Sequence, residues 1–220
     1  MDFEQARFNM IEQQIRPWQV LDPDVLQLLS LVRREDFVPA SQRNLAFTDT
    51  ELPLPAAGGQ RLLLPPRVEA RLLQEARVQP QDRVLEVGTA NGYLTALLGH
   101  QAAEVISVDS DSALQEEARQ RLRRLGLTRC ELVQGPPLEG CVSRGPFDLI
   151  VLTGSVPDLP KALLAQLKPG GRLIGIVGDE PVMRAVRVQQ GAAGQFSRTE
   201  LFDTMAARLP GVVEPSAFAF

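Results

Sequence analysis

The segment VLEVGTANGY, from Val84 to Tyr93, has the composition of a ligand-binding turn between a strand and a helix. Gly88 and Gly92 permit a tight turn and a close approach of a ligand to the backbone, and the helix that follows presents free N–H groups. A phosphate-binding loop would need Gly-Lys-Ser/Thr, and a dinucleotide fingerprint would need glycines where Ala90 and Tyr93 stand. The turn can therefore hold a nucleotide-like group, but it matches neither phosphate-binding pattern.

An acidic residue lies at the distance from this turn at which a ribose is bound in such folds. Asp109 ends the next predicted strand, 109 − 88 = 21 residues beyond Gly88, and a carboxylate there can accept hydrogen bonds from both ribose hydroxyls. Glu86 is expected to order the amides of the turn or to meet the cationic end of the ligand. The pattern predicts an adenosine ligand without phosphates. The alternative is that Gly88 and Gly92 only shape a turn and Asp109 caps a strand.

Alternating strands and helices position these residues. Short runs of Val, Ile and Leu predict strands at 83–88, 104–109, 131–134, 147–153 and 172–178, with helices at 93–99, 112–125 and 159–167. Two more strands, at 184–189 and 196–202, are expected to form a hairpin. The sequence thus predicts an α/β fold with a doubly wound, mostly parallel sheet and a C-terminal antiparallel hairpin.

The first 78 residues have a different, mainly helical pattern. Asp22 can cap a helix that begins with Pro23, and further amphipathic stretches cover 8–15 and 67–78. Because no repeat or long linker follows, we expect residues 1–78 to be an N-terminal helical extension packed on the same domain as residues 79–220.

Composition excludes several classes of function. With 23 Lys and Arg against 27 Asp and Glu, the net charge is −4 and the pI about 5.2, which excludes a generally basic nucleic-acid binder. Charges interrupt every apolar run, so no membrane span is expected, and the N-terminal MDFEQARFNM does not resemble a signal peptide. Cys130 and Cys141 form no disulfide framework or metal-binding pattern. We therefore expect a cytoplasmic protein without a metal.

The order of motifs along the chain resembles the protein-L-isoaspartate O-methyltransferase family, among the class I S-adenosylmethionine-dependent methyltransferases. The matching segments are REDFVP (34–39), AFTD (46–49), LPLP (52–55), GQ (59–60), VLEVGTANGY (84–93), PFD (146–148) and LKPGGRL (167–173), within roughly residues 5 to 180. The resemblance implies a seven-stranded sheet with a reversed final hairpin, S-adenosylmethionine as cofactor, and a substrate loop within residues 1–78. It also implies methyl transfer to the carboxylate of isoaspartyl or D-aspartyl residues in damaged proteins.

Site residues follow from the glycine turn, the strand ends and this resemblance. The predicted cofactor-binding residues are Glu86, Gly88, Thr89, Ala90, Gly92, Tyr93, Asp109, Ser110, Gly135 and Pro136. Thr153 and Ser155 follow a central strand at its carboxyl end and are expected to edge the cleft. The resemblance places Gln60 and Leu63 near the substrate. The single histidine, His100, is expected at a helix end and not as a general base. An acceptor carboxylate is already anionic, so the reaction needs alignment rather than a base.

Three positions depart from the family pattern. Leu63 stands where the family has its active-site serine, in a loop that reads Gln60-Arg61-Leu62-Leu63-Leu64-Pro65 rather than Gln-Thr-Ile-Ser-Gln-Pro. Arg61 can supply a charge for a carboxylate substrate, or it can be a solvated loop arginine. Pro136 replaces an aspartate that accepts a hydrogen bond from the adenine amino group, and Ala90 replaces the middle glycine of the turn, where a methyl group intrudes if φ is positive.

These departures leave three hypotheses. The first is an isoaspartyl methyltransferase whose partner is a protein or peptide substrate. The second is a methyltransferase for another acceptor, because residues 62–64 make the substrate loop apolar. The third is a binding module that kept the fold and lost turnover. The sequence does not indicate an oligomeric state.

Overall fold

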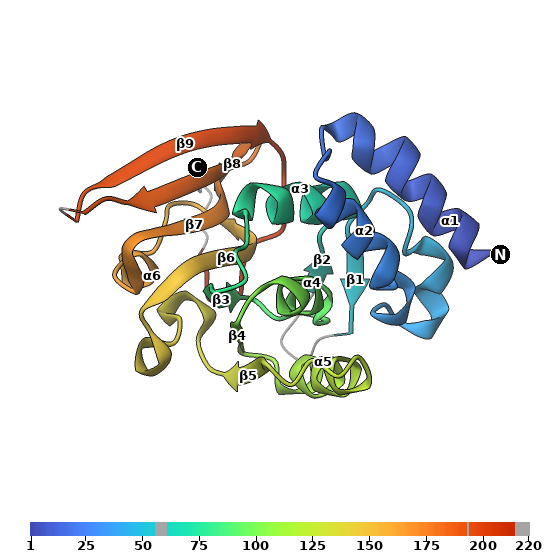
Figure 1. The fold of residues 1–220 in the computed structure, drawn as a ribbon, viewed down its shortest axis with the longest axis horizontal. Helices are drawn as coiled ribbons and strands as arrows, with labels where there is room; N and C mark the ends of the chain where they lie inside the picture. The colour runs from blue at the N-terminus through green and yellow to red at the C-terminus, as the bar shows by residue number, and fades with distance from the viewer. Residues whose placement is uncertain (56–60, 193, 214–220) are drawn as a thin grey trace, which may run out of the picture.

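The computed structural model describes residues 1–55, 61–192 and 194–213. Within them, the central element is a seven-stranded sheet of order β5-β4-β3-β6-β7-β8-β9 (Figure 1). Its strands are β3 (Arg83–Val87), β4 (Glu104–Asp109), β5 (Cys130–Gln134), β6 (Phe147–Val156), β7 (Leu167–Asp179), β8 (Val182–Gln190) and β9 (Phe196–Asp203). Strands β3 to β7 are parallel, and β8 and β9 are antiparallel additions at one edge. The predicted fold class and final hairpin are confirmed.

The helices precede and alternate with these strands. They are α1 (Phe3–Met10), α2 (Pro23–Leu31), α3 (Pro66–Ala76), α4 (Tyr93–Gln101), α5 (Ser112–Arg124) and α6 (Lys161–Leu164), and a π-helical stretch at Ile11–Ile15 continues α1. A separate two-stranded antiparallel sheet joins β1 (Leu52–Leu54) to β2 (Arg61–Leu63). The helix expected at 159–167 was too long, because Leu167 already pairs with Phe147 as the first residue of β7.

Capping residues set the ends of two helices. Asp22 accepts hydrogen bonds from the backbone N–H groups of residues 24 and 25 at the start of α2, and Asp111 accepts those of residues 113 and 114 at the start of α5. Gly126, with φ of +69°, ends α5, because Leu127 N then donates to the carbonyl of Leu122 at 3.0 Å. The sequence predicted the cap at Asp22 and the helix over 112–125, but not the cap at Asp111.

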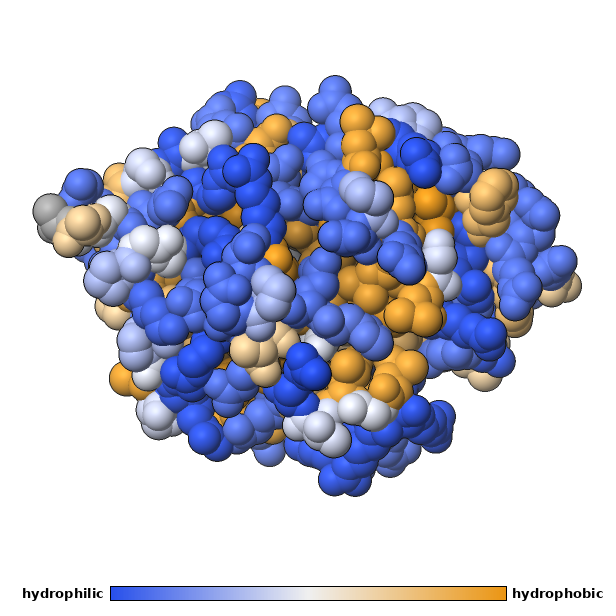
Figure 2. Space-filling view, in the orientation of Figure 1, coloured by the Kyte–Doolittle hydropathy of each residue, from blue (hydrophilic) through white to orange (hydrophobic). Residues whose placement is uncertain are grey.

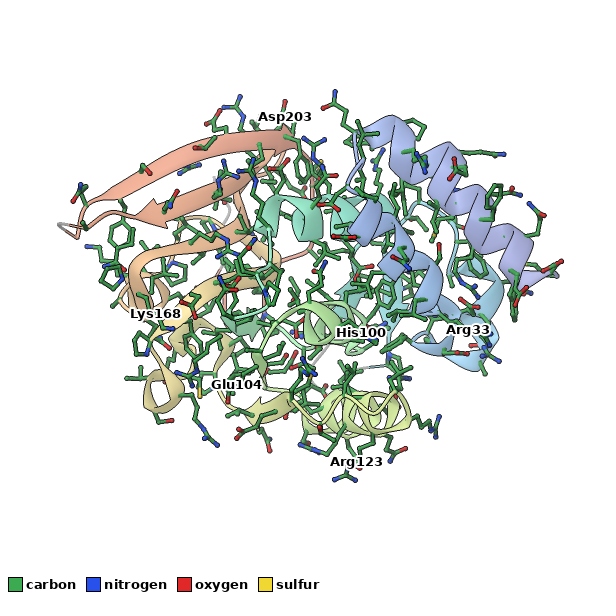
Figure 3. The ribbon with its side chains drawn as sticks, in the orientation of Figure 1. Arg33, His100, Glu104, Arg123, Lys168 and Asp203 are labelled. Carbon is green, nitrogen blue, oxygen red and sulfur yellow. The ribbon has the colours of Figure 1, made fainter. Side chains whose placement is uncertain are left out.

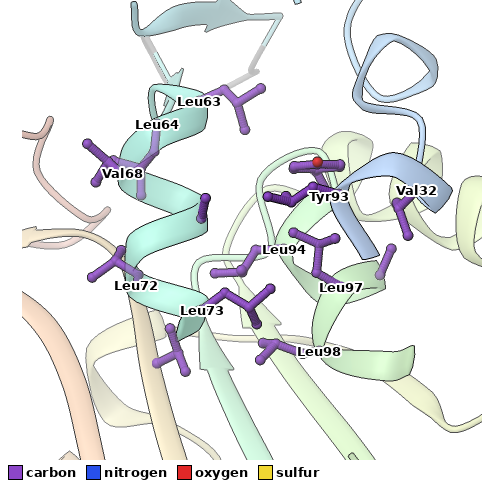
Figure 4. Close-up of a cluster of buried hydrophobic side chains, with 14 of the residues drawn as sticks. Val32, Leu63, Leu64, Val68, Leu72, Leu73, Tyr93, Leu94, Leu97 and Leu98 are labelled. Atoms are coloured by element: carbon purple, nitrogen blue, oxygen red, sulfur yellow. The ribbon is translucent and has the colours of Figure 1, made fainter. Parts of the chain in front are cut away.

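Buried side chains form a separate core on each face of the sheet. On one face, α3 and α4 pack through leucines such as Leu72, Leu73 and Leu97 (Figure 4), and the core extends to buried residues of α1 and α2. On the other face, Leu85 and Ile150 pack with residues of α6 and of the segment after β9. The first core includes residues from 1–78 and from the sheet, and the division of the chain at residue 78 stays a prediction.

The strand order creates a switch point between β3 and β6. From β3 the chain continues to β4 and β5 on one side, whereas β6 continues to β7 on the other. The two strands are paired neighbours, with Val87 opposite Leu152. Ligands of open α/β sheets bind outside the carboxyl ends of the strands at such a point. Gly88 and Thr153 follow these two positions directly, so the fold places the predicted site there.

The surface carries mainly polar and charged side chains on the face that Figure 2 shows. The face in Figure 2 is mostly hydrophilic, and hydrophobic side chains gather on it near α2. His100 lies exposed in the last turn of α4, as expected, and Arg33, Glu104 and Asp203 also lie on the outside of the molecule (Figure 3). Among the described residues, none of the helices is long and apolar enough to cross a membrane.

Candidate functional site

Asp109 is an acidic residue held by several contacts at the carboxyl edge of the sheet. It ends β4 with its side chain fully buried. Its Oδ1 accepts a hydrogen bond from Asp111 N at 3.0 Å, and its Oδ2 accepts one from Ala90 N at 3.0 Å. Arg61, at the first position of β2, forms an ion pair with the same Oδ2. The carboxylate predicted to bind the ribose is thus fixed by backbone N–H groups at the glycine turn and strand end, and it also has a cationic partner in Arg61.

Glu86 lies in β3 on the face covered by α4, and it is completely buried. Its Oε2 accepts hydrogen bonds from the hydroxyls of Thr95 and Ser107, at 2.5 and 2.6 Å, while Oε1 has no partner among the described residues. Burial raises the pKa of Glu86 to about 8. The two hydroxyl donors lower this pKa, and the nearby Asp109 carboxylate raises it further. The unpaired Oε1 is a buried acceptor available to a cationic ligand group.

A small cavity connects Glu86 with the β1–β2 hairpin. It is lined by Glu69 and Glu86, by the turn residues Gly88 to Asn91, by Leu62 to Leu64, and by Leu94 and Thr153. Glu69 of α3 is buried and forms an ion pair of 3.1 Å with Arg34, which is fully buried and also donates to Leu64 O at 2.6 Å. Burial raises the pKa of Glu69 to about 7, although the Arg34 charge opposes the shift. The cavity is therefore apolar where the hairpin lines it and acidic where Glu86 of β3 and Glu69 of α3 line it.

The glycine turn has the backbone conformation that its sequence predicts. Gly88 and Gly92 have φ of +98° and +83°. A Cβ on Gly92 would lie 2.8 Å from the Cβ of Ala118 on α5, so the turn packs closely against that helix. Ala90 also has a positive φ, +48°, in the left-handed region that is unfavourable for a residue with a Cβ. The methyl group at this position therefore introduces strain, which was one of the two outcomes considered from the sequence.

The other predicted cofactor residues surround this turn in different ways. The Thr89 hydroxyl lies 2.7 Å from that of Ser107, so it belongs to the hydrogen-bond network of Glu86. Ser110 is exposed directly after Asp109, and Gly135 N donates to Asp109 O at 3.0 Å. Pro136 follows at the surface. These strand-end residues come together at the same edge as Asp109, and their contact with a cofactor stays a prediction.

Tyr93 points away from the cavity lining. Its buried ring packs edge-on against Phe37, with 5.3 Å between ring centroids, and the Arg34 guanidinium lies 5.5 Å from its centroid. Its hydroxyl has no hydrogen-bond partner among the residues described, and burial raises its pKa. The Tyr93 backbone N–H donates to Asn91 Oδ1 at 3.1 Å. In this structure Tyr93 joins the turn to the core of the N-terminal helices.

The predicted substrate residues differ in their accessibility. Leu63 is buried and lines the cavity together with Thr153, whose hydroxyl is within hydrogen-bonding distance of the carbonyls of Val87 and Gly88. Ser155 is fully buried, and its hydroxyl donates to Ala206 O at 2.7 Å, which leaves it engaged with the backbone. Gln60 lies outside the described residues. Leu63 and Thr153 are thus brought together, and all four roles stay predictions.

Three features of the site were not found from the sequence. Arg61 was considered for a substrate or a solvent role, but the structure pairs it with Asp109. Glu69 lines the cavity from α3 and is identified only by its buried pairing with Arg34. Leu209 closes the site from the far end of the chain, since a Cβ on Gly88 would lie 2.8 Å from its Cδ2. For the Arg34–Glu69 pair, the charged residues in REDFVP (34–39), which include Arg34, were the signal that the sequence offered.

The polar side chains of the site fit a sulfonium ligand that carries an adenosyl group better than they fit a metal ion. A buried carboxylate at a strand end suits ribose hydroxyls, and the unpaired Glu86 Oε1 suits an ammonium or sulfonium group. Within residues 1–55, 61–192 and 194–213, no group of three or more His, Cys, Asp and Glu residues is arranged to hold a metal ion. The side chains at the switch point therefore match the cofactor class expected from the sequence.

Comparisons with known proteins extend over nearly the whole chain. The family model for protein-L-isoaspartate(D-aspartate) O-methyltransferase (PCMT) matches residues 5–208. A protein-L-isoaspartate O-methyltransferase of Koribacter versatilis is 38% identical over 209 residues, which cover 95% of this chain and 92% of that protein. One of Sodalis glossinidius is 38% identical over 175 residues, 80% of this chain and 83% of the relative.

Solved structures agree in fold. A protein-L-isoaspartate O-methyltransferase superimposes with a TM-score of 0.76 at 21% identity, covering 94% of this chain and 66% of that one. A structure from Plasmodium falciparum, described as a protein-L-isoaspartate O-methyltransferase in complex with S-adenosyl-L-homocysteine, gives 0.73 at 19% identity and covers 95% and 98%. At these identities the two structures support the fold.

Proposed function

Because this chain belongs to the protein-L-isoaspartate(D-aspartate) O-methyltransferase family, it is an S-adenosylmethionine-dependent O-methyltransferase, and we propose that Asp109 and Glu86 hold its methyl donor. The observation that carries this assignment is the Asp109 carboxylate, fixed by the N–H groups of Ala90 and Asp111 at the carboxyl end of β4. At a switch point beside a glycine turn, a carboxylate so held is preorganised to accept ribose hydroxyls.

Glu86 is proposed to bind the cationic amino-acid end of the donor. Glu86 lines the small cavity, and its Oε1 has no partner in the described part of the chain, whereas Oε2 is fixed by Thr95 and Ser107. A cationic group beside Oε1 stabilises the ionised carboxylate and so lowers the pKa that burial has raised. When bound, S-adenosylmethionine supplies an activated methyl group on a sulfonium.

The acceptor is proposed to approach between Leu63 and Thr153. A carboxylate nucleophile needs no general base at neutral pH, so this part of the site has to align the acceptor and exclude water. Leu62, Leu63 and Leu64 give the cavity an apolar wall suited to water exclusion. The protein substrate of the family carries isoaspartyl residues, and we propose that this chain methylates such a residue. A cytoplasmic location also stays a proposal from composition.

The assignment is tested by two measurements on one preparation. Calorimetric titration with S-adenosylhomocysteine measures donor-site binding, and transfer of a radiolabelled methyl group from S-adenosylmethionine to an isoaspartyl peptide measures activity. We expect both, with transfer absent for the matching peptide that contains an ordinary aspartyl residue. Binding without transfer to the isoaspartyl peptide would refute the proposed acceptor and retain the donor site.

The apolar wall provides a sharper test of the acceptor. Leu63→Ser restores the hydroxyl that the family has at this position, and a hydrogen bond to a charged acceptor contributes about 1.5 to 3 kcal/mol. The variant is expected to lower the KM for the isoaspartyl peptide. Leu21→Ser, at a leucine that is 65% exposed and does not line the cavity, is the control and should not lower it. A higher KM in Leu63→Ser alone would indicate an acceptor that requires the apolar side chain.

A further inference from the structure

Arg61 points toward the site from the same face of β2 as Leu63. In the β1–β2 pair, Arg61 lies opposite Leu54 and Leu63 opposite Leu52. Side chains two residues apart on a strand lie on the same face. Leu63 lines the cavity, and Arg61 reaches the Asp109 carboxylate at the edge of the glycine turn. The guanidinium therefore occupies the proposed ribose position, on the same face of β2 as the Leu63 side chain that lines the proposed acceptor position.

The ion pair uses a hydrogen-bonding position that a ribose needs. A carboxylate accepts about four hydrogen bonds. Asp109 already accepts from Asp111 N, from Ala90 N and from the Arg61 guanidinium, which leaves about one position for the two hydroxyls of a ribose. The two backbone donors belong to the turn and stay in place. Arg61 and the ribose consequently compete for Oδ2.

The Arg61 guanidinium has hydrogen-bonding capacity that its ion pair with Asp109 does not use. Its Nη1 is buried and has no hydrogen-bond partner among the residues described. The other end of β2 is fixed, because Arg34 donates to Leu64 O at 2.6 Å from its pairing with Glu69. Arg61 thus stays anchored on the strand whose residues 62–64 line the cavity, and its guanidinium can bind a carboxylate with two parallel hydrogen bonds.

We propose that Arg61 changes partner during the reaction: it pairs with Asp109 until the cofactor ribose displaces it, and it then binds the carboxylate of the acceptor. The inference rests on the proposed function for the identity of the acceptor. It assigns to Arg61 the polar recognition that Leu63 cannot provide. It also makes cofactor and acceptor bind with positive coupling, because the first ligand frees the group that the second one needs.

Binding measurements test the two halves separately. Arg61→Gln should bind S-adenosylhomocysteine and 5′-methylthioadenosine, which lacks the amino-acid part, about tenfold more tightly, the effect of one hydrogen bond to a charged group. In the native protein, saturation with S-adenosylhomocysteine should raise affinity for an isoaspartyl peptide about tenfold, and Arg61→Gln should abolish this coupling. Arg61→Lys should keep part of it. Arg33→Gln, at an exposed arginine, is the charge control and should change neither quantity.

Several results would overturn the proposal. Unchanged affinity of Arg61→Gln for both nucleosides would exclude competition with the ribose. Weaker binding of S-adenosylhomocysteine with unchanged 5′-methylthioadenosine would show that Arg61 binds the amino-acid carboxylate of the cofactor instead. Coupling that persists in Arg61→Gln would exclude its acceptor role. A native protein that binds both ligands but transfers no methyl group would refute the proposed function alone, since the nucleoside affinities of Arg61→Gln would still decide the competition.

Discussion

The buried Glu86 carboxyl group is predicted to make the folded protein less stable as the pH rises. Burial raises its pKa from 4.5 to about 8, so between these values the folded chain keeps a proton that the unfolded chain has released. The contribution of Glu86 to the free energy of unfolding is therefore highest below pH 4.5, and it falls as the pH rises to about 8. Glu86→Gln retains an oxygen that can accept from Thr95 and Ser107 and has no proton to lose, so its stability lacks this contribution.

The magnitude follows from proton linkage. One proton difference changes the free energy of unfolding by about 1.4 kcal/mol per pH unit, which amounts to about 2 to 3 kcal/mol between pH 5.5 and 7.5 once partial titration is included. Urea unfolding of both proteins at these pH values measures it. Glu69 and His100 titrate in both proteins, so the difference between them isolates Glu86.

An exposed carboxylate provides the control for this measurement. Glu4→Gln, at a side chain that is 81% exposed, should follow the native protein at every pH. The reasoning would be refuted if the stability difference between Glu86→Gln and the native protein stayed constant from pH 5.5 to 7.5. A stability of Glu86→Gln relative to the native protein that decreased as the pH rose would refute it as well, because the buried carboxylate would then be stabilised by its surroundings.

Three further predictions concern the donor site. Asp109→Ala should weaken binding of S-adenosylhomocysteine at least about 100-fold in calorimetry, since two hydrogen bonds to a charged group are lost; a loss under tenfold would contradict the ribose assignment. Gly92→Ala should lower the free energy of unfolding by about 2 to 4 kcal/mol, because φ is +83° and the new Cβ would lie 2.8 Å from that of Ala118. Ala90→Gly should not destabilise the protein, since relief of the positive φ offsets the entropy of glycine, whereas the exposed Ala113→Gly should cost about 0.5 to 1 kcal/mol. Chemical denaturation measures these changes in the free energy of unfolding. Equal losses in Ala90→Gly and Ala113→Gly would contradict the strain at Ala90.

The sequence predicted the sheet and the donor side of the site well because both depend on local patterns. Short segments rich in Val, Ile and Leu marked β3 and β4, and the spacing between Gly88 and Asp109 is fixed by one strand, one helix and two turns. The length of α6 was predicted less well. A run of leucines fits a helix or a strand equally, and pairing of Leu167 with Phe147 decides in favour of the strand.

The acceptor side could not be predicted because its contacts connect distant segments. Arg61 meets Asp109 across 48 positions, and that pairing depends on how the β1–β2 hairpin packs against the sheet. The Arg34–Glu69 pair joins residues 35 apart in the N-terminal region. Side-chain type gives no indication of the partner in such cases, since any of the other acidic residues could have matched each arginine in charge.

The donor site is complete only after Leu209, near the end of the sequence, has been synthesised and has packed against the glycine turn. Leu209 packs beside Gly88, and the segment that carries it is held to the end of β6, where Ser155 N donates to Ala207 O at 2.8 Å and Leu209 N to Ser155 O at 3.0 Å. Contacts between such distant residues require closure of a long loop and form late. A nascent chain that has released β3 to β7 from the ribosome therefore has the glycine turn but not its outer wall. Tight cofactor binding then becomes a late event in biogenesis, after residue 209 has emerged and docked.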